Sequence, residues 1–190
     1  MKGYSNYAVT ILFGQKEQKG YDNMTICENT LEQVIISELQ KKGYKRLYGP
    51  DINRDYHEVI LKDCFEEAIY GINPGVNEKI ILETYRVIRD FGLLKLEDMN
   101  VAFHKYLVEG VPVNYRINGE LHTYTVKLID FANPERNQFY VVDQYTVIEY
   151  KNKRPDILVF VNGIPLVLFE LKNITNEDTT IEHAYKQVKN

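Results

Sequence analysis

Three residues in the last third of the sequence have the types and spacing of a metal-dependent nuclease site. Asp156 ends the run Arg154-Pro155-Asp156, and Glu170-Leu171-Lys172 begins fourteen residues after it. Two carboxylates can hold Mg²⁺, because this cation prefers oxygen ligands. A lysine beside them can orient a water molecule or stabilise the charge that develops on a phosphate. The pattern therefore predicts hydrolysis of a phosphodiester bond.

The turn between the two apolar runs decides whether both carboxylates can reach one metal ion. Asn162-Gly163 joins these runs. With a two-residue hairpin, Asp156 and Glu170 would point to opposite sides of the sheet, because side chains alternate along a strand. With a three-residue loop, Val161-Asn162-Gly163, and a G1 bulge, both carboxylates would share a side with Lys172. The metal site therefore predicts an odd loop or a bulge, and regular two-residue pairing would contradict it.

A second interpretation of these residues involves no chemistry. Asp156 and Glu170 could be polar residues at strand ends, with Lys172 as a solvated neighbour, because short patterns match often by chance. However, Glu170 directly follows the apolar run Leu166-Val167-Leu168-Phe169. A carboxylate in that position is costly to bury unless it is paired or binds a cation. This position favours a site.

The chemistry would need hard oxygen ligands, which suits Mg²⁺ or Mn²⁺. We expect Asp156, Glu170 and the backbone carbonyl of Leu171 to bind the metal ion. A bound metal ion polarises a phosphate and lowers the pKa of a bound water molecule. Lys172 would position that water molecule or stabilise the charge of the transition state.

Two residues on predicted helices are further candidates. Glu32 lies on the first helix and could be a fourth catalytic residue, although it could equally be a boundary or capping glutamate. Glu28 competes with it from one turn earlier. Gln187, on the last predicted helix, could reach a nucleotide or the lysine. From the residues alone, Gln187 is a surface residue.

Other common sites have no support in the sequence. The histidines at 57, 104, 122 and 183 show no ligand spacing, which argues against a zinc site. No phosphate-binding loop of the Gly-x-x-x-x-Gly-Lys-Ser/Thr type occurs in these residues. No serine or cysteine has a convincing set of catalytic partners.

The periodicity of apolar residues predicts that helices come first, then strands, then one more helix. The predicted helices run from 29 or 30 to about 42 and over 57–70, 76–89, 96–108 and 178–188. The predicted strands, which we expect to be antiparallel, are 113–117, 121–131, 139–150, 157–161 and 166–171. This order predicts an α+β or mixed α/β fold around one sheet. We expect a single domain over 1–190, with a helical insert at about 57–108.

Composition limits the class of protein. The chain has 190 residues and a formal net charge of −4, so a basic surface that grips DNA unaided is not expected. Any affinity for nucleic acid should be weak or supplied by a partner. The sequence contains no secretory signal or membrane-spanning run and only two cysteines, which predicts a reduced, cytoplasmic protein. The chain stops within a helical pattern, so we expect it to be a fragment of a longer protein.

Several runs together resemble one family, the N-terminal region of the restriction (R) subunit of type I restriction–modification enzymes. The resemblance extends from about residue 27 to the end. It is carried by Cys27-Glu28-Asn29-Thr30-Leu31-Glu32, Gly43-Tyr44, Gly110-Val111-Pro112-Val113, Asn118-Gly119-Glu120, Leu128-Ile129-Asp130-Phe131-Ala132-Asn133-Pro134, Asn137-Gln138-Phe139, Asp143-Gln144-Tyr145, Arg154-Pro155-Asp156, Val161-Asn162-Gly163-Ile164-Pro165-Leu166 and Glu170-Leu171-Lys172-Asn173.

The resemblance implies a PD-(D/E)xK nuclease with a restriction-endonuclease-like core, a central mixed sheet and flanking helices. Asp156, Glu170 and Lys172 match its catalytic positions. Related resolvase-like nucleases carry a glutamate eleven residues before a Gly-aromatic pair, which favours Glu32 over Glu28. The family also has a Gln-x-x-x-Tyr motif. Gln187 fits its glutamine, but the tyrosine would fall at position 191, beyond the sequence.

The resemblance also implies an activity and its partners. We expect a Mg²⁺-dependent endonuclease, a type I site-specific deoxyribonuclease, that cuts double-stranded DNA non-specifically within a restriction complex. The modification and specificity subunits would be partners through the full-length chain. ATP would serve only motor domains that these residues do not contain. The alternatives are a stand-alone resolvase-like nuclease and a catalytically weak docking module of the same fold.

Overall fold

The chain folds into two units of mixed helix and strand. The computed structural model describes residues 28–92, 95–117, 119–148 and 152–171. Among these residues, unit 1 contains 60–138 and 161–164, and unit 2 contains 28–59, 139–160 and 165–171. The hairpin turn at 162–163 thus belongs to unit 1, whereas the outer parts of its two strands belong to unit 2.

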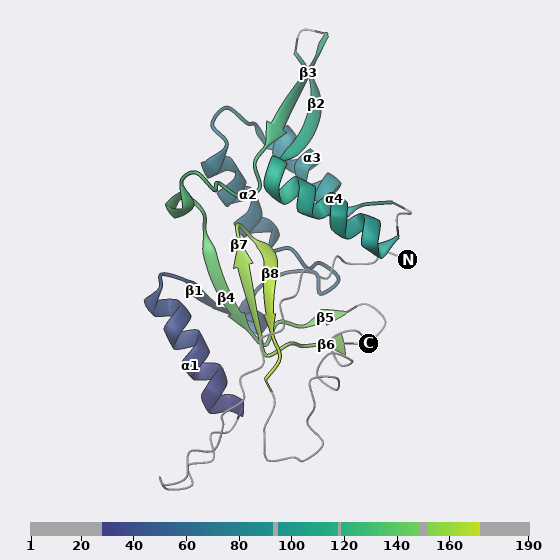
Figure 1. Ribbon diagram of the computed structural model, residues 1–190. Coiled ribbons are helices and arrows are strands. Elements are labelled where there is room, and N and C mark those ends of the chain that lie inside the picture. Colours follow the sequence, from purple (N-terminus) through teal and green to yellow (C-terminus); the bar gives the residue numbers. More distant parts are fainter. Residues whose placement is uncertain (1–27, 93–94, 118, 149–151, 172–190) are drawn as a thin grey trace, which may run out of the picture. The chain divides into compact units, whose positions relative to one another are not determined.

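Unit 2 is built on a four-stranded sheet with a helix beside it (Figure 1). The strand order is β1-β4-β7-β8, and β1 runs parallel to β4. These elements are α1 (Glu28–Lys41), β1 (Lys45–Tyr48), β4 (Phe139–Asp143), β7 (Ile157–Val161) and β8 (Ile164–Phe169). The α+β fold class predicted from the sequence is confirmed.

Helix α1 ends where the sequence predicts an end. Gly43 has a φ of 93°, the left-handed conformation that glycine adopts without strain. The backbone N–H of Gly43 bonds to the carbonyl of Gln40, and that of Tyr44 bonds to the carbonyl of Leu39. This Schellman arrangement satisfies carbonyls at the end of the helix and directs the chain into β1.

The core of unit 2 lies between α1 and one face of the sheet. Its buried members lie on α1, β4, β7 and β8 and in the short segment after β8: Ile36, Val141, Ile157, Val159, Phe169 and Leu171. Leu31, Ile35, Leu39, Tyr44 and Val167 pack against them. Since Ile36, Leu31, Ile35 and Leu39 lie on one stripe of α1, the helix is fixed to the sheet by its apolar face.

The turn between β7 and β8 is tight. Asn162 and Gly163 have φ values of 51° and 76°, and two successive left-handed residues are characteristic of a type I′ turn. The three-residue loop predicted from the sequence is therefore wrong. Asn162 adopts this conformation because its side chain is held by buried hydrogen bonds, which spacing alone did not reveal.

The core members of β7 and β8 do not have the parity that regular pairing from a two-residue turn would give. Regular pairing outward from a two-residue turn would place Val159 on the same face as Leu166, because side chains alternate. Instead, Val159 belongs to one core with Val167 and Phe169. Strand β8 has six residues and β7 has five. We infer that β8 carries one extra residue, a bulge, and Pro165 near the turn is compatible with it.

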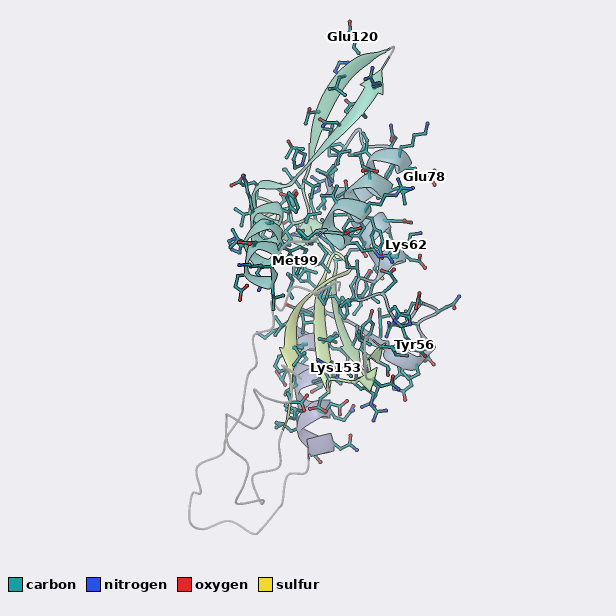
Figure 2. The ribbon with its side chains drawn as sticks, turned by 90° about the vertical axis from the view of Figure 1, so that its right-hand side faces the viewer. Tyr56, Lys62, Glu78, Met99, Glu120 and Lys153 are labelled. Atoms are coloured by element: carbon teal, nitrogen blue, oxygen red, sulfur yellow. The ribbon has the colours of Figure 1, made fainter. Side chains whose placement is uncertain are left out.

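Unit 1 consists of three helices and a two-stranded hairpin. The elements are α2 (Lys62–Ile72), α3 (Glu78–Arg89), α4 (Leu96–Glu109), β2 (Val111–Ile117) and β3 (Glu120–Val126). Strands β2 and β3 pair antiparallel over their whole length. Glu120 lies at the tip of this hairpin (Figure 2). Phe65 and Tyr85, both buried, pack edge to face between α2 and α3.

Helix α2 begins at Lys62 and not at 57 as predicted. The backbone N–H of His57 binds the side chain of Asp55, and that of Glu58 binds its carbonyl, so this segment forms a turn. The N–H of Leu61 then bonds to the carbonyl of Gly163. The start of α2 is therefore fixed to the β7–β8 turn, which lies far away in the sequence.

The strand predictions also differ from the structure, where the strand predicted at 166–171 is β8 (Ile164–Phe169). The predicted strand 139–150 is two strands, β4 and β5 (Val147–Ile148), because Gln144 has a φ of 57° and breaks the extended backbone. The predicted strand 121–131 ends at Val126, because the Asn73 side chain binds the backbone N–H and carbonyl of Lys127. Strand β1 was not predicted, because it is short and mostly exposed.

The remaining elements are small. Strand β5 pairs with β6 (Asn152–Lys153), and single 3₁₀ turns occur at Gly49–Asp51 and Pro134–Arg136. The predicted helix 178–188 lies outside the described residues. In the part of the chain that the structure describes, no helix combines the length and apolarity needed to cross a membrane.

Candidate active site

Asp156 lies beside the backbone that follows Glu170. Its Oδ2 accepts a hydrogen bond of 2.6 Å from the backbone N–H of Leu171. Asp156 precedes β7 by one residue, and Glu170 follows β8 by one residue. The structure therefore brings together the two segments on which the sequence placed the metal ligands.

Glu170 is a buried carboxylate at the end of an apolar strand. It is 8% exposed, and its neighbours Phe169 and Leu171 are 7% and 3% exposed. Phe169 and Leu171 both belong to the core under α1. Because side chains alternate along an extended backbone, we expect the Glu170 side chain between them on the other face of the sheet. In the same way, Asp156 directly precedes Ile157, which belongs to the core. Each of the two carboxylates therefore stands one residue away from a core position.

Glu32 is also buried and lies within electrostatic range of Asp156. It is 9% exposed on α1. Burial raises the pKa of its carboxyl above the ordinary value, and the negative charges of Asp143 and Asp156 raise it further. A hydrogen bond from the side chain of Gln144 and the positive charge of Arg46 act in the opposite direction. Glu32, the predicted fourth catalytic residue, therefore lies near Asp156.

An ion pair that the sequence analysis did not propose borders the same place. Asp143, 3% exposed at the end of β4, accepts two hydrogen bonds from Arg46, at 3.0 Å from Nε and 2.8 Å from Nη2. This bidentate pairing raises the pKa of Arg46 further. Arg46 Nη1 also lies 3.5 Å from Oε1 of Gln33 on α1. The pair joins β1, β4 and α1 beside Glu32.

A sequence signal for Asp143 did exist. Like Glu170, it ends an apolar strand, and a buried acid in that position needs a partner. The Asp143-Gln144-Tyr145 run contributed only to the family resemblance, because nothing in its spacing indicated that it would lie near Glu32.

The oxygen donors present fit a small hard cation. Asp156, Glu170 and the carbonyl of Leu171 are the predicted ligands, and all three lie on the two joined segments. Carboxylate and carbonyl oxygens suit Mg²⁺ and Mn²⁺ and not softer metals. Within 28–171, leaving out the short gaps, no three His, Cys, Asp or Glu side chains converge as a metal cluster. The predicted donor set has only two carboxylates, with a backbone oxygen beside them.

Two predicted site residues lie outside the described residues. These are Lys172, the residue directly after Leu171, and Gln187. Their roles stay predictions.

In unit 1, a buried asparagine holds the turn that joins β7 and β8. Asn162 is fully buried. Its Oδ1 accepts from the N–H of Gln138, and its Nδ2 donates to the carbonyl of Leu128 and to Oδ1 of Asn137, each at 2.8 Å. Its backbone N–H donates to the carbonyl of Gln138 at 2.8 Å. The sequence indicated a turn here but not this network.

The comparisons with known proteins agree on one family. The model of the family described as "Type I restriction enzyme R protein N terminus" matches residues 25–190. A protein of Methanocaldococcus jannaschii, provisionally named type I restriction enzyme MjaIXP endonuclease subunit, is 32% identical over 94% of this chain and 18% of its own length.

Two further relatives carry names of the same kind. The type I restriction enzyme HindI endonuclease subunit of Haemophilus influenzae is 33% identical over 84% of this chain and 16% of its own length. The SauMSSORF170P endonuclease subunit of Staphylococcus aureus is 25% identical over 85% of this chain and 16% of its own length. The chain thus spans less than a fifth of the length of these curated relatives.

Proposed function

We propose a function from one premise: the chain belongs to the family of type I restriction enzyme R protein N termini. On this premise, the chain is the nuclease region of a type I restriction enzyme. It hydrolyses phosphodiester bonds of double-stranded DNA, without sequence preference of its own, in a reaction that depends on Mg²⁺ or Mn²⁺. The observation that carries the proposal is the hydrogen bond between Asp156 and the backbone after Glu170.

Each site residue has a defined task in this reaction. Asp156, Glu170 and the carbonyl of Leu171 would hold the metal ion. When bound, the metal supplies a Lewis acid that polarises the phosphate and lowers the pKa of a water molecule. Lys172 orients the attacking water or balances the negative charge on the phosphate. Glu32, whose pKa is raised by burial, would accept a hydrogen bond or a proton from that water.

The rest of the complex would supply what these residues lack. The relatives are named endonuclease subunits, and this chain spans less than a fifth of their length. We assign ATP-driven translocation to the remaining length, and sequence recognition to modification and specificity subunits. We place the complex in the cytoplasm with its DNA substrate. A net charge of −4 fits this division, because the nuclease region need not find DNA unaided.

The decisive experiment measures DNA cleavage by the full-length protein in its complex. We expect Asp156→Ala and Lys172→Ala each to lower the cleavage rate by at least about 100-fold, because each removes a group needed in the transition state. Removing divalent metal with EDTA should abolish cleavage, and Mg²⁺ or Mn²⁺ should restore it.

The control separates cleavage from the other activities of the complex. Both variants should hydrolyse ATP and bind DNA at the wild-type level. Wild-type cleavage by either variant would refute the nuclease assignment. If Mn²⁺ binding to the protein did not depend on Asp156 and Glu170, these residues would not be metal ligands, and a docking role would be favoured.

A further inference from the structure

Gln144 has a backbone conformation that side chains disfavour. Its φ is 57°, and among the described residues only Asn162 is another non-glycine residue with positive φ. Asparagine tolerates this conformation better than most residues, whereas glutamine has no such advantage. A strained residue persists only where its surroundings hold it, and such residues cluster at functional sites.

The residues around Gln144 prevent the strain from relaxing. The preceding residue, Asp143, is fixed to β1 by the bidentate pair with Arg46. The following residue, Tyr145, is fully buried, and its hydroxyl donates to the carbonyl of Val59 at 3.0 Å. A Cβ at Gly49 would overlap the carbonyl of Gln144, so this glycine lets the backbone pass closely. The conformation of Gln144 is thus imposed from both sides.

The side chain of Gln144 has a different use from that of Asn162. The amide of Asn162 bonds to backbone and to another asparagine, and so it holds the scaffold. The amide of Gln144 instead donates to the carboxylate of Glu32. Glu32 is buried beside two further acids, Asp143 and Asp156, so without this bond it would face mostly like charge.

We propose that Gln144 is a positioning residue, which its strained backbone holds so that its amide fixes the carboxylate of Glu32 toward Asp156. This role rests on the proposed nuclease function. Asp143 and Arg46 contribute by anchoring the end of β4. The amide, being neutral, orients Glu32 without adding a positive charge that would compete with a bound cation.

The test replaces Gln144 by two residues with opposite structural properties. Glycine adopts positive φ without strain and removes the amide. In Gln144→Gly, we expect hydrogen-exchange protection of residues 139–148 in the full-length protein to equal or exceed the wild type. The single-turnover cleavage rate should nevertheless fall about 10- to 100-fold, the scale of one lost hydrogen bond to a charged group. The Kd for DNA should not change.

The second variant, Gln144→Glu, keeps the shape of the side chain. It replaces the donor by a carboxylate that repels Glu32, so cleavage should fall at least as far as in Gln144→Gly. Asn162→Gly is the matched structural control. It also relieves a positive φ, but it should lose hydrogen-exchange protection around the turn because three side-chain hydrogen bonds disappear.

The outcomes separate this proposal from the proposed function. Wild-type cleavage by both Gln144 variants would overturn the positioning role. Loss of both hydrogen-exchange protection and cleavage in Gln144→Gly would also overturn it, because the residue would then support the fold. Asp156→Ala is assayed in parallel. If Asp156→Ala also cleaves DNA normally, the nuclease assignment itself fails. If Asp156→Ala is inactive and the Gln144 variants are active, only the inference fails.

Discussion

Asp130, Asp143 and Glu170 each follow an apolar residue and are buried, yet their surroundings differ. Asp143 pairs with Arg46 in two hydrogen bonds. Asp130 in unit 1 is contacted by Asn133 and by two cations. Glu170 directly precedes Leu171, whose backbone N–H donates to Asp156. The same sequence signal thus indicates a buried acid needing compensation. Only the structure shows which acids serve the scaffold and which border a site.

Asp130 should make the stability of unit 1 depend on pH in the acid range. Burial itself raises the pKa of its carboxyl. The hydrogen bonds from Asn133 and the charges of Lys127 and Arg136 outweigh burial and hold the pKa below its ordinary value. The unfolded chain therefore binds a proton more readily, and the stabilisation is present above the ordinary aspartate pKa and lost as pH falls through the lowered one.

The measurement is the urea midpoint as a function of pH, from about pH 6 down to about pH 2.5. Asp130→Asn should be less stable than the wild type at neutral pH. Its stability should also fall less steeply on acidification, because the titrating group is gone. Parallel curves for the two proteins would show that Asp130 does not cause the dependence.

Gly163 should not tolerate a side chain, because the turn lies against α2. A Cβ there would come within 2.6 Å of the carbonyl oxygen of Leu61 and the backbone nitrogen of Phe65. Its φ of 76° adds strain for any L residue. We expect Gly163→Ala to lower the free energy of unfolding by about 2 to 5 kcal/mol, the sum of overpacking and left-handed strain.

Gly75 is the matched control, because its φ is 91° but an added Cβ would meet nothing within 4 Å. Gly75→Ala should therefore cost only the backbone strain, about 1 to 2 kcal/mol. Urea unfolding of both variants gives the comparison. Equal losses would mean that the contact with Leu61 and Phe65 does not restrain the turn.

At the scale of elements, the sequence pattern predicted those helices and strands whose bounds are set by residues close together in the sequence. Helices α1, α3 and α4 appear close to their predicted bounds, because their apolar stripes and end signals lie within a few turns. Strand β7 appears at its predicted bounds for the same reason. By contrast, β1 is recognisable only through its pairing with β4, almost a hundred residues away.

The departures from prediction share a cause in long-range hydrogen bonds. Asn73 ends β3 at Lys127, Gly163 accepts from Leu61 at the start of α2, and Asn162 closes a tight turn. None of these partners is near in sequence. For the site, the approach of Asp156 to the segment that follows Glu170 was predictable. Arg46 and Gln144 were not, because they reach it through pairing and an unusual backbone.

Helix α1 should position Glu32 through its contact with the sheet. Ile36, one turn after Glu32, is 1% exposed and lies in the core with Val141 and Ile157. Ile36→Ala should lower the free energy of unfolding by about 2 to 5 kcal/mol, because a cavity remains. We also expect slower DNA cleavage by the full-length protein, since Glu32 loses its support.

Val34 provides the control on the same helix. It is 50% exposed, so Val34→Ala should change stability by no more than about 0.5 kcal/mol and leave cleavage unchanged. Urea unfolding and the cleavage assay test both variants. If Ile36→Ala were as mild as Val34→Ala, α1 would not depend on this core for its position.

At the scale of the whole molecule, charge limits what this chain can do alone. It carries 27 acidic and 23 basic residues, and the buried acids Glu32 and Asp143 lie near Asp156 of the candidate site. Carboxylates repel phosphates until a cation offsets their charge. A nuclease of this composition therefore gains from being held on its substrate by other parts of an assembly.

The 190-residue chain should accordingly bind double-stranded DNA only weakly. Non-specific binding comes from neutralised phosphates, and the net charge of −4 provides little of that attraction. We expect a Kd of about 10 µM or weaker at physiological salt, measured by fluorescence anisotropy with and without Mn²⁺. The full-length protein should bind the same DNA far more tightly. Nanomolar binding by the 190 residues alone would instead favour a stand-alone, resolvase-like nuclease, since only a basic DNA-facing surface could produce it.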